Sequence, residues 1–273
     1  MSRSPPASLT GARTQLQAHF SGPESEHPDR WSKLWDAGNF LPWDRGLPQP
    51  ALVDLLSGRH NLIGDCYVED GSGGQRRKKA LVPGCGRGYD VLLLASFGYD
   101  AYGLEVSESA VKRCKEEQTN NAHKYPVKNE AAGAGIAKFV NGNFFGETWL
   151  KDVDGDGKFE LIFDYTFLCA LPPSFRPSWS LHMSQLLAPA PAANLICLEF
   201  PTYKDPSLGG PPFGLSPAVY VEHLSHPGEE LPYDDKGHIK QNPLRRASPG
   251  GLERVAHWQP ERTHEIGKGT DWV

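Results

Sequence analysis

The segment "ALVPGCGRGYD" (residues 80–90) decides the fold of this 273-residue chain. A short apolar run ends at Pro83, and three glycines, Gly84, Gly86 and Gly88, follow at every second position. An apolar run that leads through a glycine-rich turn into "VLLLASFG" is typical of a strand, a tight turn and a helix. Because glycine adopts positive φ and lets a ligand approach the backbone closely, we expect this turn to bind a small molecule.

Strands and helices are expected to alternate after this turn. Ser107 is a suitable N-cap, and Glu108 in the first turn favours a helix that begins there. The expected strands are 79–83, 100–105, 136–140, 159–164 and 193–200, and the expected helices are 88–97, 107–118 and 174–187. This rhythm is typical of βαβ units, so the expected fold class is α/β and Rossmann-like, with a mostly parallel central sheet and helices on both faces.

The rest of the chain is expected to surround this core. The expected regions are a disordered N-terminus (1–11), a helical flap over the ligand that includes a helix at 50–58 (12–60), and the core itself (61–273). Residues 69–79 are expected to form a flexible loop, and residues 202–250, rich in Pro, Gly and His, an excursion on the substrate side. Strands at 251–259 and 270–273 are expected to complete the sheet, and because the chain ends inside the second, a few further C-terminal residues are expected.

Composition argues against several classes of protein. The net charge of −5 argues against binding to nucleic-acid phosphates, and no apolar stretch approaches the roughly 20 residues of a membrane span. The N-terminus has no apolar signal-peptide core, which favours a reducing, cytoplasmic location. We expect no metal site, because no CxxC or HxxxH pair is present among the histidines and the five cysteines, Cys66, Cys85, Cys114, Cys169 and Cys197. The expected oligomeric state is a monomer.

The spacing of the glycines indicates which ligand the turn binds. Gly84-x-Gly86-x-Gly88 is one residue shorter than the dinucleotide fingerprint G-x-G-x-x-G, and no lysine follows it as in a phosphate-binding loop. The shorter turn suits a ligand without a pyrophosphate, and S-adenosylmethionine is the expected cofactor. Glu105 ends the next expected strand, where its carboxylate can accept hydrogen bonds from the ribose hydroxyls.

Two further strand ends carry candidate site residues. In "VNGNFF" (140–145), Asn143 can contact the adenine edge, and Phe144 or Phe145 can cover its ring. Asp164 and Tyr165 end the fourth expected strand, facing the methionine end of the cofactor. Both are candidates for catalysis, and Tyr165 also for cofactor binding.

Six segments together resemble the thiopurine methyltransferase-like family, above all the thiol and halide methyltransferases of plants and their fungal relatives. These segments are "WSKLWDAGNFLPWDRGLPQPALVDLL", "LVPGCGRGYDV", "GLEVSESAV", "FELIFDYTFLCAL", "RPSW" and "GGPPF". The resemblance implies a class I S-adenosylmethionine-dependent methyltransferase. It implies a cofactor pocket built from Trp31, Trp35, Trp43, Gly84, Glu105, Asn143 (where the family usually has Asp), Phe144 and Tyr165.

The chemistry of the tryptophan side chains also suggests a role that is independent of the resemblance. Aromatic faces attract a sulfonium cation by roughly 0.5–2 kcal/mol, and an aromatic flap excludes water from the transfer zone. Alternatively, Trp31 and Trp35 simply anchor an amphipathic helix, and both roles are compatible. Phe40, Trp43 and Phe213 are expected to form the apolar wall of the substrate pocket.

The expected activity is methylation of a small-molecule thiol. A free thiol is already a few per cent thiolate at neutral pH, so a dedicated base is not obligatory. If proton removal is assisted, Tyr165, Asp164 or Asp44 is expected to accept the proton, although Asp44 can instead pair with Arg45 or cap the next helix. From the family resemblance, the expected acceptor is a reduced dithiol natural product of the gliotoxin type. The alternatives are a halide or bisulfide methyltransferase and a non-catalytic S-adenosylmethionine-binding regulatory module.

Overall fold

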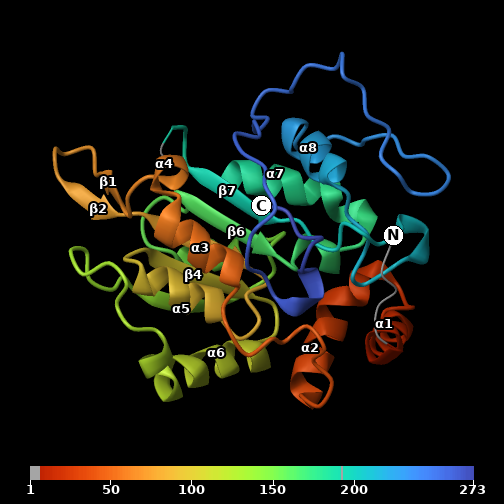
Figure 1. Cartoon of the computed structure of the whole chain (residues 1–273), viewed down its shortest axis with the longest axis horizontal. Coiled ribbons are helices and arrows are strands. Elements are labelled where there is room, and N and C mark those ends of the chain that lie inside the picture. Colours follow the sequence, from red (N-terminus) through yellow and green to blue (C-terminus); the bar gives the residue numbers. More distant parts are fainter. Residues whose placement is uncertain (1–6, 192) are drawn as a thin grey trace.

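The computed structural model describes residues 7–191 and 193–273 and has a five-stranded parallel sheet at its centre (Figure 1). Its strands are β3 (Lys79–Pro83), β4 (Asp100–Glu105), β5 (Ala137–Asn141), β6 (Leu161–Tyr165) and β7 (Asn194–Leu198). They lie in the order β5-β4-β3-β6-β7, and every neighbouring pair is parallel. The α/β fold class is confirmed, and each of these strands overlaps its predicted segment.

Helices cover both faces of this sheet (Figure 1). Along β3, Ala80 and Val82 belong to one buried cluster and Leu81 to another, as the two-residue period of a strand requires. The first cluster receives side chains from α3 (Pro50–Gly58), α4 (His60–Ile63), α5 (Tyr89–Ser96) and α6 (Glu108–Asn120). The second receives side chains from α7 (Arg176–Leu186) and α8 (Pro217–Ser225). No helix within the described ranges is long and apolar enough to cross a bilayer.

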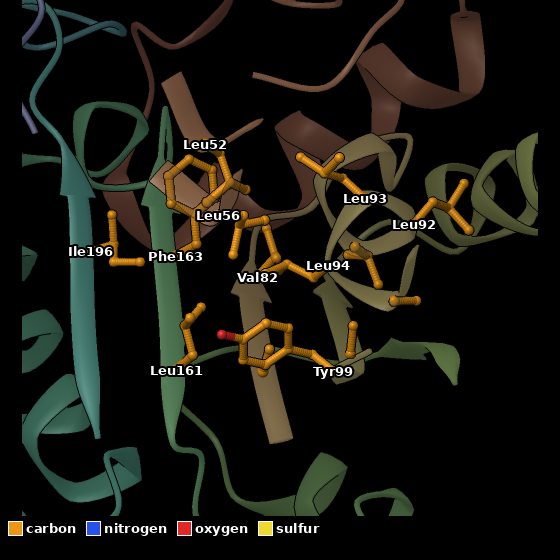
Figure 2. Close-up of a cluster of buried hydrophobic side chains, with 14 of the residues drawn as sticks. Leu52, Leu56, Val82, Leu92, Leu93, Leu94, Tyr99, Leu161, Phe163 and Ile196 are labelled. Atoms are coloured by element: carbon orange, nitrogen blue, oxygen red, sulfur yellow. The ribbon is translucent and has the colours of Figure 1, made fainter. Parts of the chain in front are cut away.

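Helix α3 belongs to the core. Figure 2 shows Leu52 and Leu56 of α3 close to Val82 and Phe163 of the sheet. These leucines are four residues apart and so share one helical face, which is fully buried. The expected flap of residues 12–60 therefore ends before α3.

Two further helices precede α3. Helix α1 (Ala7–His19) and helix α2 (His27–Ala37) pack together through Leu16, Phe20 and Leu34, and both lie in the lower right part of Figure 1. The expectation of disorder over 1–11 is wrong for residues 7–11, which belong to α1. Residues 1–6 lie outside the described part of the chain.

The segment expected to be a flexible loop, 69–79, contains a hairpin. Strands β1 (Tyr67–Glu69) and β2 (Gln75–Arg77) pair antiparallel. The turn between them is closed by Asp70, whose Oδ1 accepts the backbone N–H groups of Ser72 (2.8 Å) and Gly74 (3.0 Å). A local side-chain cap therefore orders a sequence whose composition favours disorder.

The strands expected at 251–259 and 270–273 do not form. Trp258 and Val273 exchange two backbone hydrogen bonds with each other, of 3.1 and 2.9 Å. Residue Glu199, just after β7, makes a single antiparallel bridge to Trp272. The C-terminal strap (residues 258–273) thus pairs mainly with itself and does not extend the sheet.

Candidate functional site

A cavity of about 260 Å³ lies at the carboxyl ends of the strands. The strand order reverses at β3, because β4 and β5 lie on one side of it and β6 and β7 on the other. The connections after β3 and β6 lead to α5 and α7, on opposite faces of the sheet. A crevice at such a point is where ligands bind in open α/β sheets.

The glycine turn forms one wall of this cavity. Gly84 and Gly86 have φ of +58° and +56°, in the left-handed region that favours glycine. A Cβ atom on Gly84 would lie 2.5 Å from Cδ2 of Phe167, and one on Gly86 would lie 3.3 Å from Cζ2 of Trp35. The turn therefore needs glycine for its conformation and, at position 84, also for space.

Glu105 lines the cavity at the end of β4 and is only 6% exposed. Its Oε2 accepts the N–H of Gly86 (3.0 Å), and its Oε1 accepts those of Val106 (2.9 Å) and Ser107 (3.2 Å). Burial raises the pKa of this carboxyl, and the three N–H donors act in the opposite direction. Since Oε2 accepts one bond, it keeps a lone pair for a ligand hydroxyl.

The loop after β5 closes the same end of the cavity. Asn143 lines it, and its Oδ1 accepts the N–H of Phe145 at 3.0 Å, which sets the orientation of the amide. Phe144 is buried, with ring centroids 5.3 Å from Phe145 and 5.0 Å from Phe167, both edge-on. The two residues expected to hold an adenine ring are therefore both in the wall.

Three tryptophans form the opposite wall. Trp31 and Trp35 lie on α2, and Trp43 follows on the connection to α3. The centroid of Trp43 is 5.0 Å from that of Trp31 and 5.8 Å from that of Trp35, both in edge-to-face geometry. Trp35 is 3% exposed, so α2 is anchored by a residue that also faces the cavity. Phe40 does not line the cavity, because it packs on the cluster between α1 and α2.

Asp164, expected to be catalytic, does not line the cavity. It is 2% exposed, and its two oxygens accept the indole N–H of Trp179 (2.8 Å) and the N–H of Leu168 (3.2 Å). Burial raises its pKa to about 6. The alternation along β6 turns this side chain toward α7, where it anchors the helix.

Tyr165, expected to bind cofactor and to assist catalysis, also lies outside the cavity lining. Because successive side chains of a strand point to opposite faces, Tyr165 lies on the other face of β6 from Asp164. There its ring stacks on His264 of the C-terminal strap, with centroids 5.8 Å apart. Burial raises the pKa of its phenol, so it is a poor proton acceptor at neutral pH.

Thr166 reaches the cavity in their place. Its φ of +61° is the one positive value among the non-glycine residues that the structure describes. Such a conformation is strained for a β-branched residue and is characteristic of functional sites. Cys169 lines the cavity beside it, with Sγ 3.5 Å from the carbonyl oxygen of Thr166, and burial raises the pKa of this thiol. No sequence pattern indicated either residue.

The excursion expected to build the substrate pocket contributes little to it. Within the described part of 202–250, Pro211 and Pro212 line the cavity, whereas Phe213 does not. Lys204 holds this loop, because its Nζ donates to the carbonyl oxygens of Gly209 (2.7 Å) and Pro212 (2.6 Å). The Phe213 N–H donates to the carbonyl of Cys169 (2.7 Å), which ties the loop to the turn after β6.

Sequence patterns also did not indicate the residues that α1 and α2 add to the cavity. Leu16 of α1 lines it, as does Arg13, which donates a hydrogen bond to the hydroxyl of Tyr203. His27, the first residue of α2, is 7% exposed, and its Nδ1 has no hydrogen-bond partner in the described chain. Burial lowers the pKa of His27, so its ring is neutral near pH 7.

Asp44 does not pair with its neighbour Arg45. Its Oδ2 forms an ion pair with Nε of Arg87 (2.5 Å), and its Oδ1 accepts the hydroxyl of Tyr89 at 3.0 Å. Asp44 therefore ties the tryptophan-bearing segment to the glycine turn, through Arg87, and to the start of α5, through Tyr89. As for metals, residues 7–191 and 193–273 contain no group of three or more His, Cys, Asp or Glu side chains arranged to hold an ion.

The chain is similar in sequence to known methyltransferases. Residues 26–246 match the family model described as thiopurine S-methyltransferase (TPMT). The chain is 37% identical over 233 residues to "Probable thiol methyltransferase 2" of Arabidopsis thaliana, a match that covers 85% of each protein. It is 32% identical over 239 residues to "Thiocyanate methyltransferase 1" of Brassica oleracea, covering 87% of each. A solved structure of magnesium protoporphyrin IX methyltransferase (ChlM) from Synechocystis PCC 6803 has a TM-score of 0.46 and 16% identity, over 72% of this chain and 84% of that one.

Proposed function

The chain belongs to the thiopurine S-methyltransferase family, and from this membership we propose that it methylates the sulfur atom of bulky, largely apolar thiols. It is an S-adenosylmethionine-dependent S-methyltransferase. The substrate class is supported by one feature of the cavity, which is its aromatic and proline-rich wall beyond the glycine turn.

The residues at the glycine turn fit S-adenosylmethionine. The backbone of Gly84 and Gly86 is bare, and Glu105 is held rigidly beside it with one lone pair of Oε2 free for a ribose hydroxyl. The exposed face of Asn143 and the ring of Phe144 are suited to an adenine. When bound, this cofactor supplies an electrophilic methyl group on a sulfonium.

The acceptor side of the cavity is suited to an apolar molecule. Its wall includes Trp31, Trp43, Phe145, Phe167, Phe175, Phe200, Pro211 and Pro212. Such a surface stabilises a bulky organic thiol by excluding it from water, at about 25 cal/mol per Å² of apolar area. A halide ion would instead lose its hydration without an equivalent replacement. These properties favour thiols over halide or bisulfide.

The chemistry requires positioning more than acid–base assistance. The acceptor sulfur, as thiolate, forms the new bond to the methyl carbon as the sulfonium–methyl bond breaks, and that electron pair stays on the sulfur of the departing S-adenosylhomocysteine. The aromatic wall would align the acceptor and exclude water. Asp164 and Tyr165 do not line the cavity, so neither is proposed as the base. Ionisation of the acceptor itself supplies the nucleophile. Among the residues that the structure describes, His27 is the one imidazole in the cavity wall, and its ring is neutral near pH 7.

Among such acceptors we propose a reduced dithiol natural product of the gliotoxin type. The expected support from residues 202–250 is reduced to Pro211 and Pro212. A bulky acceptor is supported instead by the number of aromatic side chains in the cavity wall. Arg13 and Leu16 of α1, which also line the cavity, add to this support.

A competition among acceptors tests the proposal. Purified protein and labelled S-adenosylmethionine are incubated with a reduced dithiol, an aromatic monothiol, iodide, thiocyanate, a catechol and a primary amine at equal concentrations. We expect the dithiol and the monothiol to be methylated fastest. Faster turnover of iodide, thiocyanate or the amine would overturn the thiol assignment, and cofactor binding without turnover of any acceptor would indicate a regulatory module.

A further inference from the structure

One guanidinium in the cavity wall has no protein partner. Arg45 lines the cavity in the segment "PWDRG" and is half-buried. Among residues 7–191 and 193–273 no hydrogen bond or ion pair engages it. Its nearest neighbour in sequence, Asp44, is committed to Arg87 and Tyr89.

The other charged side chains in the wall are also committed elsewhere. Glu105 accepts three backbone N–H groups, and Glu24 accepts the hydroxyl of Ser174. Arg13, the second arginine of the wall, donates to Tyr203. A half-buried cation without a counter-charge is unfavourable, so the pocket is electrostatically incomplete at Arg45.

The position of this charge can be inferred from the groups that it affects. Burial and, to a smaller extent, the positive charge of Arg45 lower the pKa of His264 to about 4. Arg45 also acts to lower the pKa of Tyr165, against the larger effect of burial. Since Tyr165 ends β6 and stacks on His264, Arg45 lies near the end of β6.

Glu105 and Arg45 therefore lie on opposite sides of the glycine turn. Glu105 ends β4 and Tyr165 ends β6, and β3 with its turn stands between these two strands. A ligand whose ribose reaches Glu105 and that crosses the turn presents its other end to Arg45. In S-adenosylmethionine, that end is an amino acid with a free carboxylate.

We propose that Arg45 binds the α-carboxylate of S-adenosylmethionine, by an ion pair and charge-assisted hydrogen bonds from its guanidinium. The planar donor fork of arginine matches a carboxylate in a way that lysine does not. This role depends on the identity of the cofactor and not on the proposed acceptor, so it stands if the acceptor is not a thiol. The same guanidinium could serve a small anionic acceptor, and the test separates the two sources of the anion.

Two ligands that differ only in the amino-acid group provide the test. S-adenosylhomocysteine carries the carboxylate, whereas 5′-methylthioadenosine has the same adenosine and thioether without it. Isothermal titration compares both ligands on the unmodified protein, on Arg45→Gln and on Arg246→Gln, which changes an exposed arginine outside the cavity lining. We expect Arg45→Gln to weaken S-adenosylhomocysteine about 10- to 100-fold and to leave 5′-methylthioadenosine unchanged, and we expect Arg246→Gln to change neither.

Three results would overturn the assignment. The first is equal affinity of Arg45→Gln and the unmodified protein for S-adenosylhomocysteine. The second is an equal loss for both ligands, which would indicate general damage to the pocket. The third is a raised KM for thiocyanate with S-adenosylhomocysteine affinity unchanged, which would assign Arg45 to an anionic acceptor. If Arg45→Gln does not fold, Arg45→Lys replaces it, with a smaller selective loss expected because the charge is kept but the fork is removed.

Discussion

The backbone N–H of Gly86 donates a hydrogen bond to Oε2 of Glu105 at 3.0 Å. This bond joins the turn after β3 to the end of β4, so the bare backbone and the buried carboxylate form one rigid unit. A ligand that uses both features finds them already in place and does not have to order them on binding.

Glu105→Gln is expected to weaken S-adenosylhomocysteine about 10- to 100-fold, because the amide has one acceptor oxygen where the carboxylate has two. Its NH₂ group would also face backbone N–H donors at Gly86 or at Val106. Isothermal titration measures the loss. Glu108→Gln, on the exposed first turn of α6, is the matched control and should bind normally. Unchanged affinity in folded Glu105→Gln would remove Glu105 from the site.

Gly84→Ala is expected to lower the free energy of unfolding by about 1–3 kcal/mol, since it adds backbone strain and a Cβ atom 2.5 Å from Phe167. Gly46 has a similar φ of +74° but nothing within 4 Å of its hypothetical Cβ. Gly46→Ala therefore reports the backbone strain without the clash. Denaturant unfolding of both variants should show the larger loss at Gly84, and equal losses would mean that Phe167 moves aside freely.

Asp164→Asn is expected to lower the free energy of unfolding at pH 7 by about 1–3 kcal/mol, because the amide cannot accept from both Trp179 and Leu168. The pH profile of methyl transfer should keep its shape, since Asp164 does not line the cavity. Retained thermal stability combined with abolished turnover would instead restore Asp164 as the catalytic proton acceptor.

The stability contribution of Asp164 should also depend on pH. Its pKa of about 6 in the folded chain lies above the ordinary value of about 3.9, so the folded state holds this proton more tightly than the unfolded state. This proton-linked part of the contribution, which adds to that of the two hydrogen bonds, is complete below about pH 4 and is lost as the pH rises through about 6. The difference in unfolding free energy between the unmodified protein and Asp164→Asn should therefore fall across this interval. A rise would contradict the assignment.

The pH dependence of turnover should follow the acceptor. With an aromatic and an aliphatic thiol of different pKa, kcat/KM is expected to rise until each acceptor's own pKa is passed, because the thiolate is the nucleophile. Steady-state rates over a common pH range measure the two inflections. An inflection at one pH for both thiols would point to a group on the enzyme, and its disappearance in His27→Gln would identify the ring with the unpartnered Nδ1.

Leu16→Ala is expected to raise KM for a bulky thiol several-fold while leaving the affinity for S-adenosylhomocysteine unchanged. Leu16 lines the cavity from α1 and is 5% exposed, so its removal takes apolar contact from the acceptor side. Gln15→Ala, at an exposed neighbouring position of the same helix, is the control. Equal KM values in the two variants would show that α1 does not contact the acceptor.

Local sequence patterns predicted the parallel sheet and the part of the site that is formed by the glycine turn and Glu105. The apolar run 79–83, the glycines that follow it and Glu105 at the next strand end are signals within single βαβ units, where backbone conformation and hydrogen bonding are set by near neighbours. The spacing of Trp31 and Trp35 predicted only that they share a helical face, and it was the family resemblance that implied their place in the wall.

The orientation of other side chains depended on which face of a strand they occupy and on partners far away in the sequence. Asp164 and Tyr165 end β6 in the sequence as expected, yet the strand turns one toward Trp179 of α7 and the other toward His264 of the strap. The residue that reaches the cavity is Thr166, through a positive φ that no composition rule indicates.

The sequence by itself determined the order of strands and helices, the glycine turn and its carboxylate, because each depends on residues within one or two neighbouring elements. Only the tertiary structure decided that side chains of α1, Pro211, Pro212 and Arg45 face the cavity. Within residues 7–191 and 193–273, Arg45 has no partner, because Arg87, far from it in sequence, pairs with the carboxylate of Asp44. Such pairings depend on the packing of separate segments, and no local spacing encodes them.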